Sequence, residues 1–262
     1  MLGHAQRAQD LQKSGEIMTK LIRLTGVATT ALAAAALVAG CGGGSAETTD
    51  HSGHSATAAE TAAAAAKPAK DLALTAAELP AGITAVPVGQ AQLQQSVDQL
   101  SGAANGATIT PASCGSGTAV VDAAKNLNVS QLGMAVGTVG TGVASESVIA
   151  QKPDVAKLRD SYRGACKSVT AEMSVQGQKV RTQMETTVVS DAPKTPADDL
   201  VVIEQTATSQ VAGQSTKQRS VVGIARVGSY AVSVVVMSMD STPDRALFDK
   251  LLVASIDKVA KG

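Results

Sequence analysis

Histidine is scarce in this chain of 262 residues and is confined to its first quarter. The three histidines are His4, His51 and His54, so none follows residue 70. Ser-His-Asp triads and Cys-His pairs need an imidazole as general base, and zinc sites use it as a ligand. Triad and Cys-His mechanisms are therefore excluded for the region after residue 70, and a zinc site there lacks its usual ligands.

Aromatic side chains are almost absent as well. The chain has Tyr162, Tyr230 and Phe248 but no tryptophan. Stacking on sugars or nucleobases needs such rings, so a polysaccharide-binding or single-strand-binding surface is not expected. Four basic and two acidic residues precede Cys41, which leaves 18 basic and 20 acidic residues from Cys41 onward. This balance argues against a nucleic acid partner, whose phosphates require a dense basic surface.

A signal sequence is the clearest feature that is present. Lys20 and Arg23 precede an apolar run over residues 24–38, which is short for a membrane span but typical of a signal peptide. Val38-Ala39-Gly40-Cys41 resembles the lipobox of bacterial lipoproteins, which implies cleavage before Cys41 and a diacylglyceryl group, with acyl chains such as palmitate, on its thiol. The alternative is a buried Ala-rich helix that ends in a structural cysteine. It does not account for the basic flank or for the Gly-Gly-Gly-Ser that follows.

The composition divides the chain into three parts. Residues 1–40 are the expected signal peptide, although a conventional signal of this type could also begin at Met18, and the sequence leaves the start open between Met1 and Met18. Residues 41–70 hold the lipidated cysteine and a Gly/Ser/Thr/Ala-rich linker, which we interpret as a flexible tether of about 30 Å root-mean-square span. We interpret its two histidines as polar linker residues. Residues 71–262 form a single folded domain.

Two cysteines remain if Cys41 is lipidated. Cys114 and Cys166 form an even pair in an exported domain, and such a pair is most simply a disulfide. A redox or metal role is the alternative.

Hydrophobic periodicity predicts an α+β domain with a twisted antiparallel sheet packed with helices. We expect helices over 90–101, from Pro153 to Cys166 and from Thr242 onward, and leave 117–126 ambiguous but favour a helix. We expect strands over 83–88, 107–110, 132–139, 143–151, 169–175, 180–189, 200–211, 220–227 and 230–239. Both faces of the last strand are substantially apolar, so it should be central. The final helix should direct Phe248, Leu251, Leu252, Ser255, Ile256 and Val259 toward the sheet.

Two motifs contain residues found in catalytic or phosphate-binding sites, but we interpret both as structural. Asp198-Asp199 lies at a strand entrance, where adjacent residues face opposite ways, so we expect solvated carboxylates rather than a catalytic pair. Residues 137–142 carry three glycines but lack the lysine of a phosphate-binding loop, so we expect a bend between strands. The sequence thus predicts no enzyme activity, no catalytic residue, no metal site and no cofactor.

The arrangement resembles the sensor-like extracellular domains of actinobacteria, found on serine/threonine kinases of the protein kinase H type and as free-standing lipoproteins. The resemblance rests on the lipobox and tether, Leu79-Pro80-Ala81-Gly82, Pro111-Ala112-Ser113-Cys114, the helix ending at Cys166 and the final strand with its TPDRALFDKLL helix. It spans roughly residues 72–259 and implies an antiparallel sheet with helices and a ligand cleft. The resemblance also implies disulfides: the sensor domains of these kinases carry two, and only the one between Cys114 and Cys166 carries over.

These features lead to one functional expectation. The protein is expected at the cell membrane, lipid-anchored on the extracytoplasmic face, where its domain binds a ligand or an envelope protein without catalysis, in a sensor-like or accessory role. No kinase segment is present, so any signalling needs a separate partner. The alternative is a carrier for cell-envelope lipids or glycolipids, consistent with an interior of Ala, Val, Leu and Met.

Replacing Cys41 with Ala should release the protein from membranes, because the acyl chains on this thiol supply the anchor. Membrane fractionation of cells that express the wild type and Cys41→Ala measures the effect. Retention of the variant at the wild-type level would contradict the lipobox interpretation.

Overall fold

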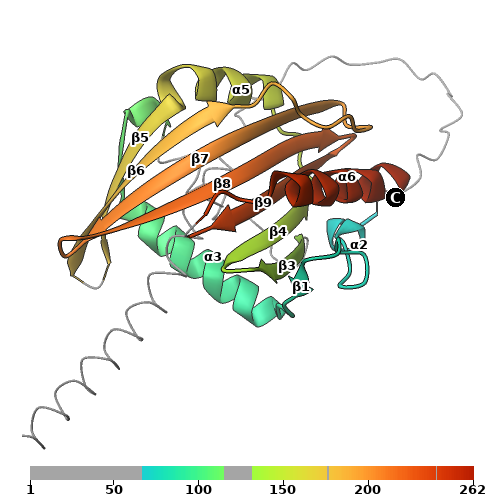
Figure 1. The fold of residues 1–262 in the computed structure, drawn as a ribbon, viewed down its shortest axis with the longest axis horizontal. Coiled ribbons are helices and arrows are strands. Elements are labelled where there is room, and N and C mark those ends of the chain that lie inside the picture. The colour runs from blue at the N-terminus through green and yellow to red at the C-terminus, as the bar shows by residue number, and fades with distance from the viewer. Residues whose placement is uncertain (1–66, 115–131, 176, 240) are drawn as a thin grey trace, which may run out of the picture.

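The computed structural model describes residues 67–114, 132–175, 177–239 and 241–262, which include one nine-stranded antiparallel sheet (Figure 1). The strand order is β1-β3-β4-β9-β8-β7-β6-β5-β2. The strands are β1 (Thr84–Ala85), β2 (Thr108–Thr110), β3 (Gly133–Val139), β4 (Gly142–Ile149), β5 (Ser168–Val175), β6 (Gln178–Val188), β7 (Asp199–Val211), β8 (Gln214–Val227) and β9 (Tyr230–Ser238). The α-helices are α2 (Ala69–Leu72), α3 (Gln90–Asn105), α5 (Val155–Arg163) and α6 (Arg245–Lys261). The predicted antiparallel sheet with helices is confirmed, with the sheet as the dominant part.

The strands β7, β8 and β9 lie in the middle of the sheet and follow one another as hairpins. Their two-residue turns suit the twist of the sheet. Ala212 and Gly213 both have positive φ, 49° and 81°, which is the two-residue turn that favours right-twisted hairpins. Gly228, with φ of 58°, begins the two-residue turn before β9. β9 pairs with β4 on one side and β8 on the other, so the prediction that it is central is confirmed.

Helix α6 covers one face of β4, β9 and β8 (Figure 1). Asp244 caps its N-terminus by accepting a hydrogen bond from the Leu247 N–H. All six residues predicted to face the sheet are buried, and Phe248 is 0% exposed. A Cβ on Gly223 of β8 would lie 2.9 Å from Leu252 Cδ1, so the glycine lets the helix pack directly on the strand backbone.

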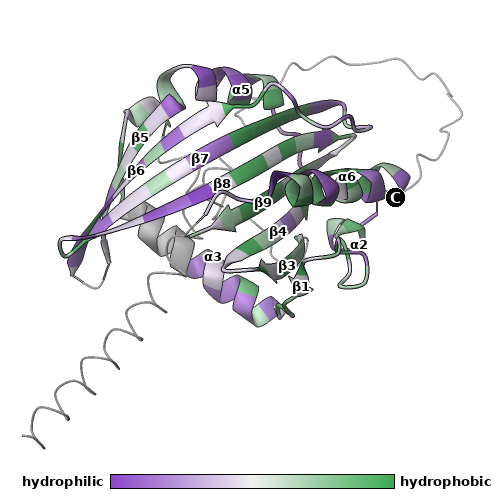
Figure 2. Cartoon of the chain, viewed as in Figure 1, coloured by the Kyte–Doolittle hydropathy of each residue, from purple (hydrophilic) through white to green (hydrophobic). Residues whose placement is uncertain are grey.

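Hydropathy follows this packing. Figure 2 shows apolar residues along the strands near α6, and polar residues toward the ends of β6, β7 and β8 away from it. On this outer part the strands present exposed residues such as Arg181 and Lys217. Only part of this sheet face is therefore covered, as expected for an antiparallel sheet.

Helix α5 covers the opposite face of β6, β7 and β8. Val155, Leu158 and Tyr162 pack with Ile203 and Val222 in a second apolar cluster. Arg159 of α5 pairs with Asp199 of β7 at 2.5 Å and also donates to the Leu200 carbonyl. These contacts fix α5 against one end of this sheet face.

A disulfide joins Cys114 to Cys166, as the sequence predicted. Cys114 ends a short 3₁₀ turn (Ala112–Cys114) after edge strand β2, and Cys166 lies in another (Ala165–Lys167) before β5. Because β2 and β5 also pair with each other, the bond fastens the edge of the sheet beside α5.

Several boundaries differ from the prediction. Cys166 is buried, but from a 3₁₀ turn rather than from the end of α5, because α5 stops at Arg163 and is followed by Gly164. Helix α5 begins at Val155 rather than at Pro153, and Asp154 caps it. Helix α3 continues through Gly102 to Asn105, and the expected strand over 83–88 is reduced to two residues. Residues 117–126 lie outside the described residues.

Replacing both Cys114 and Cys166 with Ser should lower the melting temperature without abolishing the fold. The bond closes a segment with a sequence separation of 52, and the chain-entropy model gives it roughly 4 kcal/mol. Calorimetry of the variant and of the reduced wild type should show matching decreases. Two free thiols in native protein, found by mass spectrometry under non-reducing conditions, would refute the prediction.

Candidate functional site

The chain enters the domain through a segment, residues 67–83, that lies against α6 and β4. We call it the entry segment. Its Leu72 and Leu74 are 2% and 6% exposed and belong to the core under α6. The Tyr230 hydroxyl donates to the Lys67 carbonyl at 2.6 Å. The start of the described domain is thus tied to both the sheet and the core.

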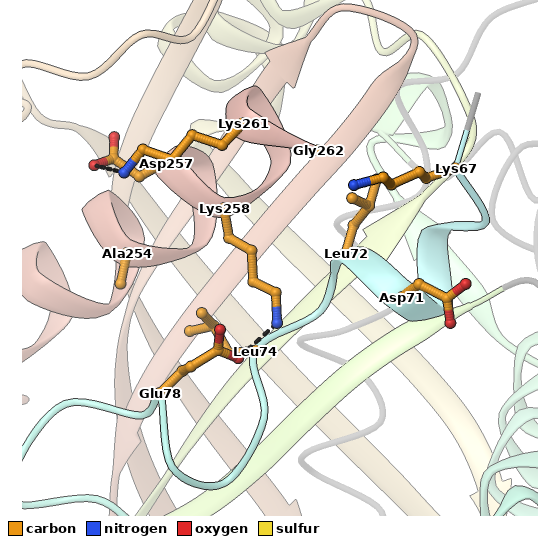
Figure 3. A pocket seen from close by; sticks show the side chains of 10 residues that line it. All are labelled: Lys67, Asp71, Leu72, Leu74, Glu78, Ala254, Asp257, Lys258, Lys261 and Gly262. Atoms are coloured by element: carbon orange, nitrogen blue, oxygen red, sulfur yellow. Dashed lines mark hydrogen bonds and ion pairs between the residues drawn. The ribbon is translucent and has the colours of Figure 1, made fainter. Parts of the chain in front are cut away.

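A pocket of about 510 Å³ lies between the entry segment and the end of α6 (Figure 3). Ten residues line it: Lys67, Asp71, Leu72, Leu74, Glu78, Ala254, Asp257, Lys258, Lys261 and Gly262. Lys258 points across it to Glu78, and their ion pair measures 2.5 Å. Lys261 pairs with Asp257 at 3.6 Å. Much of the charge in the pocket is therefore already neutralised within the protein.

Lys258 also donates to the Ala73 carbonyl at 2.7 Å, so it holds the entry segment at two points. The pKa of Glu78 is lowered to about 2, mainly by the Lys258 ammonium and then by hydrogen bonds from Thr75. Thr75 and Glu78 form the hydrogen bond that the capping-box pattern predicts, with the Thr75 N–H donating to Glu78 Oε2. A turn follows this hydrogen bond instead of a helix. The Lys258–Glu78 ion pair therefore connects α6 to the entry segment.

Glu146 of β4 lies beneath this segment and is 1% exposed. Its Oε2 accepts the Leu74 N–H at 2.9 Å, while its Oε1 has no partner in the described part of the chain. Burial raises its pKa to about 7, against the opposing effects of the Leu74 hydrogen bond and the Lys258 charge. Glu146 and Glu78 therefore differ in protonation over a wide pH range, although both border the same segment.

A second polar region lies on the sheet face that α5 partly covers. We call it the neutral patch. It consists of six uncharged residues on β6, β7 and β8, each 5% exposed or less: Thr182, Thr186, Gln205, Ser209, Gln218 and Ser220. The register places Thr186, Gln205 and Ser220 in one row, and Thr182 and Ser209 in another. Gln218 lies between these rows on β8.

Hydrogen bonds satisfy only part of the neutral patch. Thr182 and Ser209 share a hydrogen bond of 2.9 Å, and Gln205 Nε2 donates to Thr186 Oγ1 at 3.3 Å. The carbonyl oxygens of Gln205 and Gln218 are buried and have no donor among the described residues. A buried acceptor without a donor is destabilising by about 1–3 kcal/mol, so native structures rarely keep one without a reason.

The sequence-predicted residues lie in different parts of the chain. Cys41 lies outside the described residues, so its lipidation stays a prediction. Cys114 and Cys166 come together as predicted. Asp198 and Asp199 separate: Asp199 pairs with Arg159, and Asp198 accepts from the Gly228 N–H. Within residues 137–142, Gly140 and Thr141 form the turn between β3 and β4, so the expected bend between strands is present.

Sequence reasoning missed Glu146, Gln205 and Gln218. The available signal was a polar residue at an inward position of an alternating strand, such as Glu146 between Ala144 and Val148, which are both buried. The described residues contain no group of three or more His, Cys, Asp or Glu side chains placed to hold a metal ion. Within the same ranges, no helix is long and apolar enough to cross a membrane.

Comparison of the chain with protein-family models, with curated proteins and with solved structures finds no match.

Glu146 should make the protein less stable as the pH rises from about 4.5 to 7. The pKa is about 7 in the folded state and 4.5 in the unfolded reference, so the folded state binds more protons in this window. The loss across the window should be roughly 3 kcal/mol, from the free energy of one pKa unit. Glu146→Gln should remove most of this slope while its amide still accepts the Leu74 N–H.

Chemical denaturation at pH 5, 6, 7 and 8 measures the slope. Glu78→Gln is the matched control, because the lowered pKa of Glu78 affects stability only between about pH 4.5 and 2. This control should keep the wild-type slope between pH 5 and 8. The same slope in wild type and Glu146→Gln would show that Glu146 is not the titrating group.

Proposed function

We propose that the protein is a lipid-anchored extracytoplasmic module whose domain binds a ligand or an envelope partner without turning it over. The signal sequence and Cys41 support the anchor, and the Gly/Ser/Thr/Ala-rich residues 42–70 support a tether that holds the domain away from the lipid surface. The docked entry segment supports the same organisation, because a tether attached at residue 67 would meet a firmly held part of the domain.

The observation that carries the binding proposal is the pair of buried amide carbonyls at Gln205 and Gln218. Both side chains are at least 95% buried, both oxygens lack a donor within the described residues, and both lie on one sheet face. Such groups cost stability in the empty protein and are satisfied when a ligand brings donors. The arrangement favours recognition over reaction, because the neutral patch combines only amides and hydroxyls.

A sensor-like or accessory role follows from this organisation. A domain on the extracytoplasmic face of the cell membrane can change its contacts with an envelope partner when its ligand binds. Any signal would then be transmitted by that partner. The second candidate is a carrier for envelope lipids or glycolipids. It is favoured by the apolar row beside the neutral patch, in which Ile203 and Val222 are buried and Val188 is partly buried.

Purification of the complete protein from its own cell envelope, followed by mass spectrometry of what co-purifies, tests the proposal. A defined small molecule or protein partner at about one per domain is the expected result. A stoichiometric acylated lipid would favour the carrier. Reproducible hydrolysis of an envelope substrate, or the absence of any bound species in repeated preparations, would contradict the binding role.

A further inference from the structure

The neutral patch also indicates which chemistry its ligand should have. Gln205 and Gln218 lie on adjacent strands, and the register pairs Gln205 with Ser220, two residues beyond Gln218. The two glutamines are therefore diagonal neighbours on one face, with Cβ atoms roughly 7–8 Å apart. Side chains as long as glutamine can reach a common ligand over this separation.

The unmet groups are acceptors, so the ligand has to donate hydrogen bonds. The Oε1 atoms of Gln205 and Gln218 each lack a donor in the described ranges. If either amide turned by 180°, it would present its NH₂ group instead, and the ligand would have to accept. A hydroxyl meets both needs, because it donates one hydrogen bond and accepts others.

The patch is free of charge on its own strands. On β6 and β7, every residue of this face between the Arg159–Asp199 ion pair and the hairpin tip at Ala212 is neutral. The residues of β8 on this face are also neutral from Gln214 to Ile224. A charged ligand group buried here would have no counter-charge on these strands and would be disfavoured. This property favours an uncharged head group.

Apolar residues adjoin the patch on the same face. Ile203 and Val222 form the next row toward α5 and are fully buried, whereas Met184 and Ala207, beside Gln218, are only half-buried. Because α5 already covers Ile203 and Val222, a ligand that places its polar group on the glutamine carbonyls would contact hydrocarbon at Met184 and Ala207. The partial exposure of Met184 and Ala207 shows that the patch borders accessible surface.

We propose that the neutral patch binds an uncharged amphiphile whose head group donates hydrogen bonds from hydroxyl groups to Gln205 and Gln218. This inference rests on the proposed binding function and adds the chemical class of the ligand. The rival explanation is that ordered water satisfies the two carbonyls and that no ligand binds there.

Three short probes with the same acyl chain separate these explanations. Monohexanoylglycerol is neutral and has two hydroxyl donors, methyl hexanoate is neutral without donors, and hexanoate is an anion. The complete chain in lipid nanodiscs is equilibrated with each probe by dialysis, and the retained probe is measured. Wild type should retain monohexanoylglycerol at least tenfold more tightly than either other probe. Equal retention of the three, or a preference for hexanoate, would overturn the proposal.

Gln218→Met tests the site itself, because methionine keeps the side-chain length and removes the carbonyl. The matched control is Gln210→Met, an exposed position on the opposite face of β7. Gln218→Met should lose the tenfold preference for monohexanoylglycerol. Nanodiscs with this variant also measure how much of each probe partitions into the lipid, and this amount is subtracted. Gln210→Met should behave as wild type. Unchanged binding in Gln218→Met would overturn the proposal.

Thermal unfolding without any probe gives an independent readout. Gln218→Met should raise the melting temperature by a few degrees, because it removes a buried carbonyl that has no donor. A lower melting temperature would mean that the amide is held by water or by the protein for stability, and would count against the proposal. If the protein from the cell envelope instead carries a stoichiometric anionic ligand or a protein partner, this inference fails while the binding function stands.

Discussion

The packing of α6 on β4, β9 and β8 is the interaction on which the rest of the structure depends. Phe248, Leu251 and Leu252 are 0% exposed and contact the strands where Gly223 leaves no side chain in the way. The same helix supplies Lys258, which holds the entry segment through Ala73 and Glu78. One helix therefore joins the apolar core to the point where the chain enters the domain.

The two faces of the sheet differ in how completely their residues are packed and hydrogen-bonded. Under α6, alternate strand residues form a continuous apolar surface, and the buried carboxylate of Glu146 there accepts the Leu74 N–H. On the face that α5 partly covers, the apolar residues end at the row of Ile203 and Val222, and the neutral patch follows. The first face is organised for stability. The second keeps buried carbonyls that an optimally packed core would exclude.

This division gives the proposed function a physical basis. Groups that bind a ligand are usually imperfectly satisfied without it, so they reduce stability in the empty protein. A sheet with a well-packed α6 face and an edge fastened by a disulfide can tolerate that loss. The entry segment lies on the α6 face, so this segment and the proposed ligand site are on opposite faces of the sheet.

Most of the secondary structure could be predicted from local pattern. Alternation in residues 180–239 and the glycine turns specify hairpins, because side-chain direction changes at every residue in a strand. The buried face of α6 was predicted residue by residue from its 3.6-residue period. The ends of α3 and α5 were not, because helix termination depends on capping and tertiary contacts as well as on glycine or proline. The pairing of Cys114 with Cys166 followed from counting cysteines.

The candidate functional residues also differ in whether local sequence pattern could predict them. The sequence by itself determined the alternation of the strands, and it carries the prediction of export and lipidation at Cys41, because both rest on local patterns along the chain. It could not show that Gln205 and Gln218 share one buried face, or that Glu146 lies beneath Leu74, 72 residues earlier. Only the tertiary structure decided these contacts, because strand register and burial arise from pairing between distant segments.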